Sequence, residues 1–400
     1  MPSGVPRSLR RCVGDADRFL REAWQCSAHL HRRRGDDDFA DLLSFDDVDR
    51  ILATMSPRPP AFRLVRAGNT LPRASYTRSG TLGGQRLTDL PDIGRVLKLF
   101  DEGATIVLQG LHRYWEPVTR FCRELEAFLT QPVQANAYLT PPVATGLNVH
   151  HDIHDVFAMQ TFGRKHWVTY APVVDDPVAS QRWDPSLGDP GEPVLDVELA
   201  PGDCLYVPRG MLHAARTVDT ASLHLTLGIR SVTWHDLFTQ VVTDAADEVR
   251  FRQALPAGYA TDPAGFAGTV SARLKELATW IEERDGGKLA ARLADRFWAS
   301  RPPVLDGQLR QLLDLDALDQ DSRVSRRDGA VAHLDVRDGR AHLQLGDRRL
   351  TLPAELEPVI GRLLSAQGLR VGDLTELDED SRVVLVRRLI REGLLVAGGE

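Results

Sequence analysis

Between residues 131 and 233, short runs that mix apolar and polar residues are separated by Gly, Pro and Asp turns. The runs that predict strands are VQANAYLTPP, GLNVHHD, DVFAMQTFG, KHWVTYAP, PVLDVELAPGD, CLYVPRG, HAARTV and SLHLTLGIR. Strands that are this short and this regularly interrupted are typical of a barrel or jelly roll. We therefore expect a β-barrel in this part of the chain.

Helical patterns flank this region. Before it, apolar residues recur at helical spacing over 39–55 and over 116–129, and the apolar run ATIVLQG between them predicts a strand. After it, the spacing predicts helices over 235–255 and 263–284. The Arg301-Pro302-Pro303 step then predicts a domain boundary, because a residue that precedes proline is disfavoured in a helix.

The last hundred residues combine segments with strand-like alternation and segments with helical spacing of apolar residues. The runs AHLQLGD and RRLTLP predict strands, and helices are expected near 356–366 and 381–393. That order of elements favours a winged helix-turn-helix. The chain is therefore expected to be α+β, with three domains at 1–233, 234–302 and 303–400.

Charge and cysteine content bear on partners and compartment. The 400 residues carry a formal net charge of -7, and residues 305–400 hold 14 Arg and no Lys against 18 Asp and Glu. Duplex binding depends on neutralising phosphates, so no nucleic acid partner is expected. The four cysteines lack CxxC spacing, and the sequence shows neither a signal-peptide core nor an apolar run long enough to span a membrane. We expect a cytoplasmic protein that does not contact membranes.

The segment Asn148-Val149-His150-His151-Asp152 is crowded with potential metal ligands. Alternate residues of a strand share a face, so His150 and Asp152 point the same way, while His151 points to the other side. A third ligand can come from His213, which follows a Pro-Arg-Gly turn in GDCLYVPRGMLH. Two imidazoles and one carboxylate form the facial triad of non-haem iron(II), which leaves positions open for substrate and oxygen.

Other polar residues nearby are not expected among the ligands. His151 has the wrong strand parity, and His154 and Asp155 lie where the strand is expected to bend. All three are interpreted as supporting or surface groups. A lone His-x-Asp pair is more often only hydrogen-bonded, and the Gly-Asp strand and turn before His213 are what favour a metal site.

These motifs resemble the jumonji-type (JmjC) ribosomal oxygenases. The run NAYLTPPVATGLNVHHDIHDVFAMQTFGRKHWVTYAP, residues 136–172, is similar to the family's central motif, and PGDCLYVPRGMLHAARTVDTASLHLTLGI is similar to its distal-histidine motif. The resemblance implies a double-stranded β-helix of the cupin or jelly-roll type, followed by a helical dimerisation region and a winged-helix domain. It also implies a homodimer.

The resemblance implies Fe(II) and 2-oxoglutarate as cofactors, and hydroxylation by dioxygen of a protein or peptide side chain, with ribosomal Arg or His first. Lys165, two residues after the hairpin glycine, would bind the distal carboxylate of 2-oxoglutarate. Arg209 would shape the turn before His213, and no catalytic residue beyond the metal ligands is expected. Asn136, Tyr138 and Thr140 alternate onto one face of their strand, and the resemblance implies that Asn136 and Tyr138 line the cofactor pocket. Thr226 is a further candidate for cofactor binding, and His224 could also face the cavity, although a core position is favoured for both.

Three alternatives stay open at this point. A cupin isomerase or a cofactor-free dioxygenase usually places several His and a Glu on its metal, and the His-x-Asp pair argues against that class. A ligand-sensing DNA-binding regulator is disfavoured by the acidic C-terminal region. A hydroxylase of a peptide natural-product precursor would use the same chemistry, and nothing in the sequence excludes it.

Overall fold

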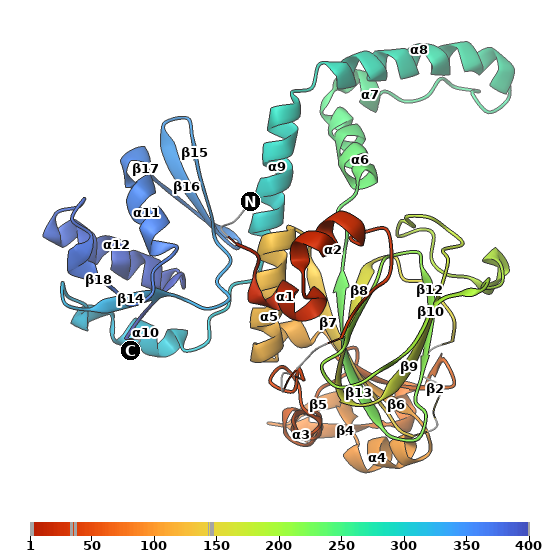
Figure 1. Ribbon diagram of the computed structural model, residues 1–400. Helices are drawn as coiled ribbons and strands as arrows, with labels where there is room; N and C mark the ends of the chain where they lie inside the picture. Colours follow the sequence, from red (N-terminus) through yellow and green to blue (C-terminus); the bar gives the residue numbers. More distant parts are fainter. Residues whose placement is uncertain (1–3, 33–34, 36–37, 143, 145–147, 399–400) are drawn as a thin grey trace. The chain divides into compact units, whose positions relative to one another are not determined.

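The computed structural model describes residues 4–32, 35, 38–142, 144 and 148–398, and the chain folds into two compact units. The first unit comprises 1–231 with 304–316 and 326–331, and the second comprises 232–303 with 317–325 and 332–400. The ribbon of the first unit is dominated by a barrel of strands, while the second unit combines helices with small sheets (Figure 1). The division into three domains at 1–233, 234–302 and 303–400 stays a prediction.

Two antiparallel sheets form the barrel. The larger has eight strands in the order β1-β11-β8-β13-β7-β6-β2-β3, and the smaller has three in the order β10-β9-β12. Residues of both sheets line one cavity, so the sheets face each other across it. The strands of the larger sheet are, in that order, His29–His31, Cys204–Val207, Asp155–Gly163, Ser222–Ile229, Val133–Thr140, Thr105–Gln109, Phe62–Arg66 and Asn69–Thr70. Those of the smaller sheet are Pro193–Leu199, Lys165–Tyr170 and Leu212–Arg216.

Helices cover the outer face of the larger sheet. Apolar side chains of α1 (Arg7–Val13), α2 (Ala16–Glu22) and α5 (Glu116–Leu129) share one buried cluster with residues of β7, β8 and β13. Strand alternation separates the two faces: on β7, Ala137 and Leu139 belong to this cluster, whereas Asn136 and Tyr138 line the cavity. The inner face of the sheet is thus left for polar side chains.

Many predicted elements are present. α5 has the predicted bounds, β6 lies within ATIVLQG, and every predicted barrel run except GLNVHHD contains a strand. In that run, Gly146 and Leu147 lie outside the described residues, and His150 forms only an isolated bridge with His213. The bend expected at His154 and Asp155 comes before a strand, because β8 starts at Asp155.

The expected helix over 39–55 is wrong in its first part. Helix α3 (Phe45–Arg50) begins after Ser44, whose side chain accepts from the backbone N–H of Asp47, while the Asp47 side chain caps in return. Residues 51–55 continue as a π-helical turn. The pattern also does not predict the hairpin β4 (Thr77–Leu82) and β5 (Gln85–Pro91), because most of its side chains are not buried and it lacks apolar alternation. Helix α4 (Ile93–Asp101) follows it.

The second unit begins with helices that coincide with the predicted segments 235–255 and 263–284. They are α6 (Trp234–Asp244), α7 (Val249–Arg252), α8 (Pro263–Glu282) and, beyond the prediction, α9 (Gly286–Ala299). Farther along come α11 (Glu357–Leu363), α12 (Glu379–Arg391) and the three-stranded sheets β15-β16-β17 and β18-β14-β19. The strands β14, β15, β18 and β19 comprise Arg323–Arg326, His333–Arg337, Leu369–Arg370 and Leu395–Ala397. AHLQLGD and RRLTLP contribute β16 (Arg340–Leu345) and β17 (Arg348–Pro353). Among the described helices, none has the length and apolar character that crossing a membrane requires.

Candidate active site

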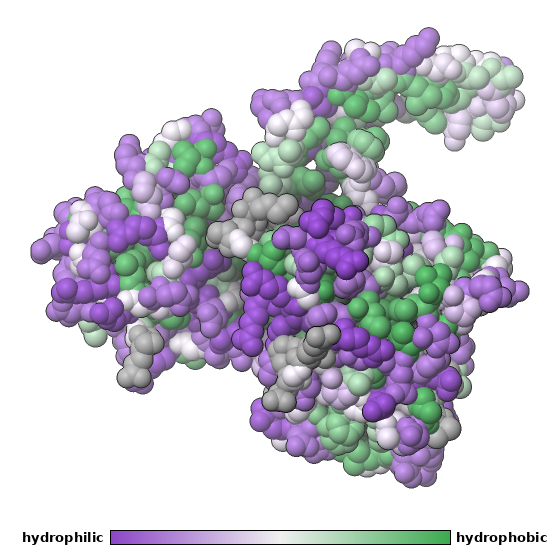
Figure 2. Space-filling model, viewed as in Figure 1, coloured by the Kyte–Doolittle hydropathy of each residue, from purple (hydrophilic) through white to green (hydrophobic). Residues whose placement is uncertain are grey.

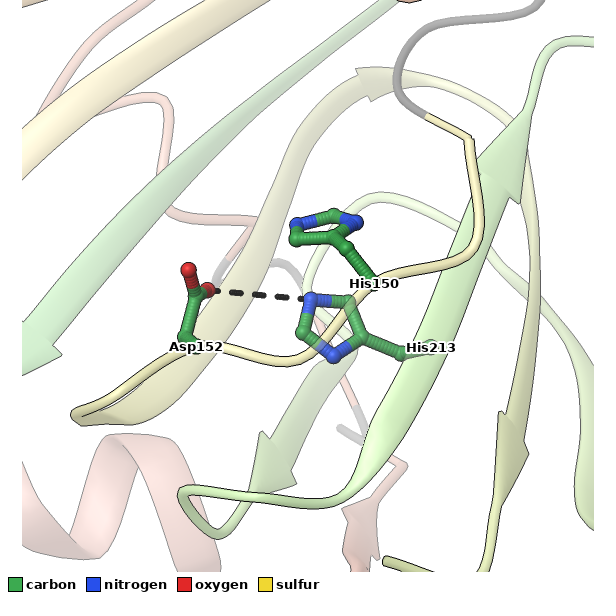
Figure 3. A group of neighbouring side chains, drawn as sticks. All are labelled: His150, Asp152 and His213. Carbon is green, nitrogen blue, oxygen red and sulfur yellow. Dashed lines mark ion pairs between the residues drawn. The ribbon is translucent and has the colours of Figure 1, made fainter. Parts of the chain in front are cut away.

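His150, Asp152 and His213 meet at one end of the barrel cavity. One potential ligand atom from each lies within 4.8 Å of the others. Figure 3 shows the three side chains converging, with the Nε2 of His213 3.7 Å from a carboxylate oxygen of Asp152. The spacing leaves room for one metal ion between them. The structure thus brings together the three residues that the sequence predicts as ligands.

Backbone hydrogen bonds join the two segments that carry these ligands. The His150 N–H donates to the His213 carbonyl over 3.1 Å, and the His213 N–H donates to the His150 carbonyl over 2.8 Å. The Gly210 N–H donates to the Asp152 carbonyl over 2.9 Å. The relative position of the ligands is therefore fixed by main-chain contacts and does not depend on side-chain packing alone.

The Pro-Arg-Gly turn requires its glycine and is held by Asp155. Gly210 has a φ of +83°, and a Cβ there would lie 2.6 Å from the Val174 carbonyl oxygen, so no other residue fits without rearrangement. The buried Asp155 carboxylate accepts from the Arg209 N–H over 3.0 Å and from the Ser231 hydroxyl over 3.0 Å. Asp155 thus anchors the turn that precedes His213, and the Arg209 side chain pairs with Asp176.

The two histidines present their Nε2 atoms to the same point. The Nδ1 of His150 lies 2.7 Å from the Asn148 carbonyl, and the Nδ1 of His213 lies 3.1 Å from the Met211 carbonyl. A carbonyl can only accept, so Nδ1 must carry the proton and the Nε2 lone pair is left for a metal. Burial and the neighbouring His150 lower the pKa of His213 to about 4, which keeps this imidazole neutral.

Asp152 is held in its charged form. Burial by itself would raise the pKa of this carboxyl, but the imidazoles of His154, His213 and His150 outweigh it and hold the pKa below the usual value. One carboxylate and two imidazoles are the donor set of a facial triad for non-haem iron(II). The residues present therefore fit that metal.

A cavity of about 230 Å³ extends from this cluster into the barrel. Its lining comes from both sheets and combines polar with apolar side chains. The residues that line it, besides the three ligands, are Arg63, Val65, Thr105, Val107, Asn136, Tyr138, His154, Val156, Lys165, Trp167, Ala215, His224, Thr226 and Gly228. The volume is sufficient for a small dicarboxylate next to a metal ion.

Lys165 stands at the other end of β9 from the cluster, since Thr169 of the same strand pairs with His213. The side chain is 2% exposed, and its Nζ donates to the Thr140 hydroxyl over 3.0 Å. Within the described residues, no carboxylate lies within ion-pair distance of it, and burial lowers its pKa to about 7. A buried amine with one neutral partner provides a site for an anion, because a carboxylate would compensate its charge.

The wall between these two ends contains four of the other predicted pocket residues, whereas Thr140 contacts Lys165 and is not among the lining residues. Asn136 pairs with Thr226 and Tyr138 pairs with His224 across β7 and β13. The rings of Tyr138 and His224 stack at 5.0 Å with an interplanar angle of 8°. Burial and the charge of Lys165 lower the pKa of His224, so this ring is neutral. All four side chains line the cavity, as does Lys165.

The cavity also contains residues that the sequence does not single out. Arg63 and Trp167 line it, and His154 lines it with a buried Nδ1 that has no hydrogen-bond partner among the described residues. His151 points elsewhere, with its Nε2 3.1 Å from the Gln181 carbonyl. The sequence could have indicated that Trp167 lines the cavity, because Trp167 alternates with Lys165 on β9. It gives no such indication for Arg63, because strand β2 is not predicted.

Similar proteins share the region that carries this site. Residues 111–237 match the family model described as JmjC domain. Ribosomal oxygenase 1 of Danio rerio is 32% identical over 255 residues, which cover 60% of this chain and 44% of that protein. A protein of Culex quinquefasciatus named bifunctional lysine-specific demethylase and histidyl-hydroxylase NO66 is 32% identical over 230 residues, which cover 55% of this chain and 33% of that protein. The chain thus spans less than half the length of these relatives.

Solved structures extend the likeness beyond the barrel. The X-ray structure of E. coli YcfD matches with a TM-score of 0.58 at 17% identity, over 97% of this chain and 99% of that chain. YcfD, a ribosomal oxygenase, in complex with cobalt and 2-oxoglutarate matches with a TM-score of 0.57 at 18% identity, over 96% and 98% of the two chains. At such identity the likeness establishes the fold alone. Together, the family match and the curated relatives confirm the resemblance: residues 111–237 match the JmjC domain, and the chain is similar to the ribosomal oxygenases.

Proposed function

We propose that this protein is an iron(II)- and 2-oxoglutarate-dependent oxygenase that hydroxylates a side chain of a protein or peptide. The observation that carries the proposal is one cavity with two complementary ends. His150, Asp152 and His213 form a facial set of metal ligands at one end, and the buried Lys165 offers an uncompensated positive charge at the other. A metal-bound dicarboxylate would satisfy both ends.

The residues of the chain supply binding and orientation. His150, Asp152 and His213 would hold the metal, Lys165 with Thr140 would hold the distal carboxylate, and the stacked Tyr138 and His224 rings would keep water from the cavity wall. When bound, the cofactors supply the activation of dioxygen, in which one oxygen atom enters succinate and the other is inserted into a substrate C–H bond. No side chain is required as a general acid or base.

A ribosomal protein is the first substrate class to test, because relatives are named ribosomal oxygenases. Hydroxylation of an unmodified residue is proposed in preference to lysine demethylation, although one relative's name contains both activities. A peptide natural-product precursor is the alternative with the same chemistry.

The proposal is tested by incubating the protein with iron(II), 2-oxoglutarate and ribosomal proteins. We expect succinate and a gain of one oxygen on an unmodified side chain. Formaldehyde release from methyl-lysine peptides with no such gain would contradict it.

We also propose that the protein is a homodimer that assembles through the helical region around 234–302. Apolar side chains are exposed there, among them Trp234 at 74%, Phe238 at 60% and Leu274 at 60%. Figure 2 shows apolar surface on this helical segment. An apolar face of this kind is typical of an interface.

The later part of the second unit is proposed to be a winged helix without nucleic acid partners. Helices α11 and α12 next to small antiparallel sheets support the first point, and the acidic balance of 305–400 supports the second. A cytoplasmic location is proposed from the four unpaired cysteines, which suit a reducing compartment.

A further inference from the structure

Arg63 is a cation on the cavity wall, and the proposed function assigns it no role in binding the metal or 2-oxoglutarate. It lies on β2, is partly buried and lines the cavity. Its Nε donates to the Gln109 side-chain oxygen over 3.0 Å, and a terminal nitrogen donates to the Thr70 hydroxyl over 3.0 Å. These acceptors are neutral, as is the Tyr138 hydroxyl, with which the guanidinium also interacts, and no described carboxylate lies within ion-pair distance of the guanidinium. A guanidinium has five N–H donors, so donors remain for a ligand.

The sheet register places Arg63 in line with the pocket residues. Arg63 pairs with Val107, and Val107 pairs with Tyr138, so the three share one row of the inner face. In the neighbouring row, Asn136 accepts from the Gly110 N–H over 3.0 Å through its amide oxygen, which leaves its amide nitrogen as a donor. The wall near the sheet edge therefore offers hydrogen-bond donors from Arg63 and Asn136, and none of its described lining residues is an acid.

The charge of the cavity points to an anionic substrate group. Among the described residues that line it, Asp152 is the sole acid. If the proposed function holds, on which this step rests, the charges of iron(II) and Lys165 are balanced by those of the 2-oxoglutarate dianion and Asp152. The positive charge of Arg63 then has no counterpart. A substrate arginine would add a second guanidinium in a site of low polarity, whereas a carboxylate would form a charge-assisted pair.

We propose that Arg63 is a specificity-determining residue that binds a substrate carboxylate, so that the hydroxylated residue is an aspartate or glutamate of a polypeptide. This differs from the Arg or His that the family resemblance implies. In the reaction, a substrate C–H bond breaks and a C–OH bond forms. Dioxygen is reduced by four electrons, of which two come from the substrate and two from 2-oxoglutarate, which leaves as succinate and carbon dioxide. Arg63 donates hydrogen bonds only and takes no part in bond making.

Peptide libraries with one fixed central residue and randomised flanks test the assignment. The fixed residue is Asp, Asn, Leu or Arg, and the full chain is supplied with iron(II), 2-oxoglutarate and oxygen. Mass spectrometry then measures the rate of oxygen gain on the central residue. We expect Asp to exceed Asn by about ten- to a hundredfold, as one charge-assisted hydrogen bond allows, and Arg to be the poorest. Arg63→Glu should reverse the order of Asp and Arg, while Arg63→Lys should keep the Asp preference at a lower rate.

Arg66→Glu is the matched control. It makes the same charge change on the same strand, but Arg66 is exposed, pairs with Glu102 and does not line the cavity, so the Asp preference should be unchanged. A wild-type preference for Arg, or an Arg63→Glu variant that keeps the wild-type ranking and only raises the KM for 2-oxoglutarate, would overturn the role of Arg63. Wild-type protein that forms no succinate with any library would instead contradict the proposed function, and the role of Arg63 with it.

Discussion

The barrel and the helical segment 232–303 differ in how far they bury their apolar side chains. In β8, seven consecutive residues are buried, because one face of the strand packs against helices and the other faces the closed barrel. In α6, by contrast, Val241 is buried while Trp234, Phe238 and Val242 are exposed. The barrel is thus complete by itself and surrounds the candidate site, whereas the helical segment exposes a surface suited to a partner. If this contrast holds, changes in the barrel interior should alter chemistry, and changes on the helices should alter assembly.

The largest effect is expected at the metal ligands. His150→Ala, Asp152→Ala or His213→Ala should reduce 2-oxoglutarate turnover by at least about a hundredfold, since losing even a partner of a ligand costs about ten- to a hundredfold. The fold should stay largely intact, because the backbone bonds between the two ligand segments remain. Succinate formation and circular dichroism measure the two properties. His166→Ala is the control, since His166 pairs with Asp196 and does not line the cavity. Full activity in any ligand variant would remove that residue from the site.

The second largest effect is expected at the buried lysine. Lys165→Ala should retain metal and raise the KM for 2-oxoglutarate by about ten- to a hundredfold, because a charge-assisted contact contributes about 1.5 to 3 kcal/mol. The variant should fold, since the wild-type ammonium is buried without an acidic partner and its removal leaves no unpaired charge. Metal titration and the 2-oxoglutarate dependence of succinate formation check both parts. An unchanged KM would show that Lys165 does not bind the cofactor.

The third effect is a pH dependence of cofactor binding. Burial lowers the pKa of Lys165 to about 7, so the amine is charged below that pH and increasingly neutral above it. A bound carboxylate favours the charged form, so binding above about pH 7 requires proton uptake, and the affinity should fall by up to about tenfold per pH unit. Calorimetry at several pH values measures the affinity. Lys165→Arg keeps its charge throughout and should show a flatter profile. The same decline in that variant would exclude Lys165 as its cause.

The smallest effect on turnover is expected from the helical segment. Trp234→Glu with Phe238→Glu should weaken dimerisation about tenfold or more, because losing a central interface aromatic costs about 2 kcal/mol or more. Turnover of 2-oxoglutarate should change by less than about twofold, since neither side chain lines the cavity. Light scattering over a concentration series measures the association. Leu82→Glu, an exposed apolar residue of the barrel unit, should change neither property. A monomeric wild-type protein at micromolar concentration would contradict the dimer.

The sequence alone indicated the candidate metal ligands, because each of the two motifs that carry them is a local feature of the chain. His150 and Asp152 are two residues apart, and the Pro-Arg-Gly turn before His213 is recognisable in the chain. The bounds of α5 could be predicted for the same reason, since apolar periodicity and the Pro break are properties of consecutive residues. The N-terminal strands could not, because β4 and β5 expose most of their side chains and thus lack an apolar alternation.

Only the tertiary structure determined which side chains line the cavity opposite the candidate metal ligands. Arg63 reaches the cavity because β2 pairs with β6 and β6 with β7, a register between segments far apart in the sequence. Likewise, the partner of Lys165 is Thr140, 25 residues away on a different sheet, and its lowered pKa follows from burial that no local pattern specifies. Strand periodicity fixes which side chains share a face, but the pairing of distant strands determines which faces enclose a site. The chemistry could therefore be inferred from the sequence, whereas the electrostatics of substrate selection required the fold.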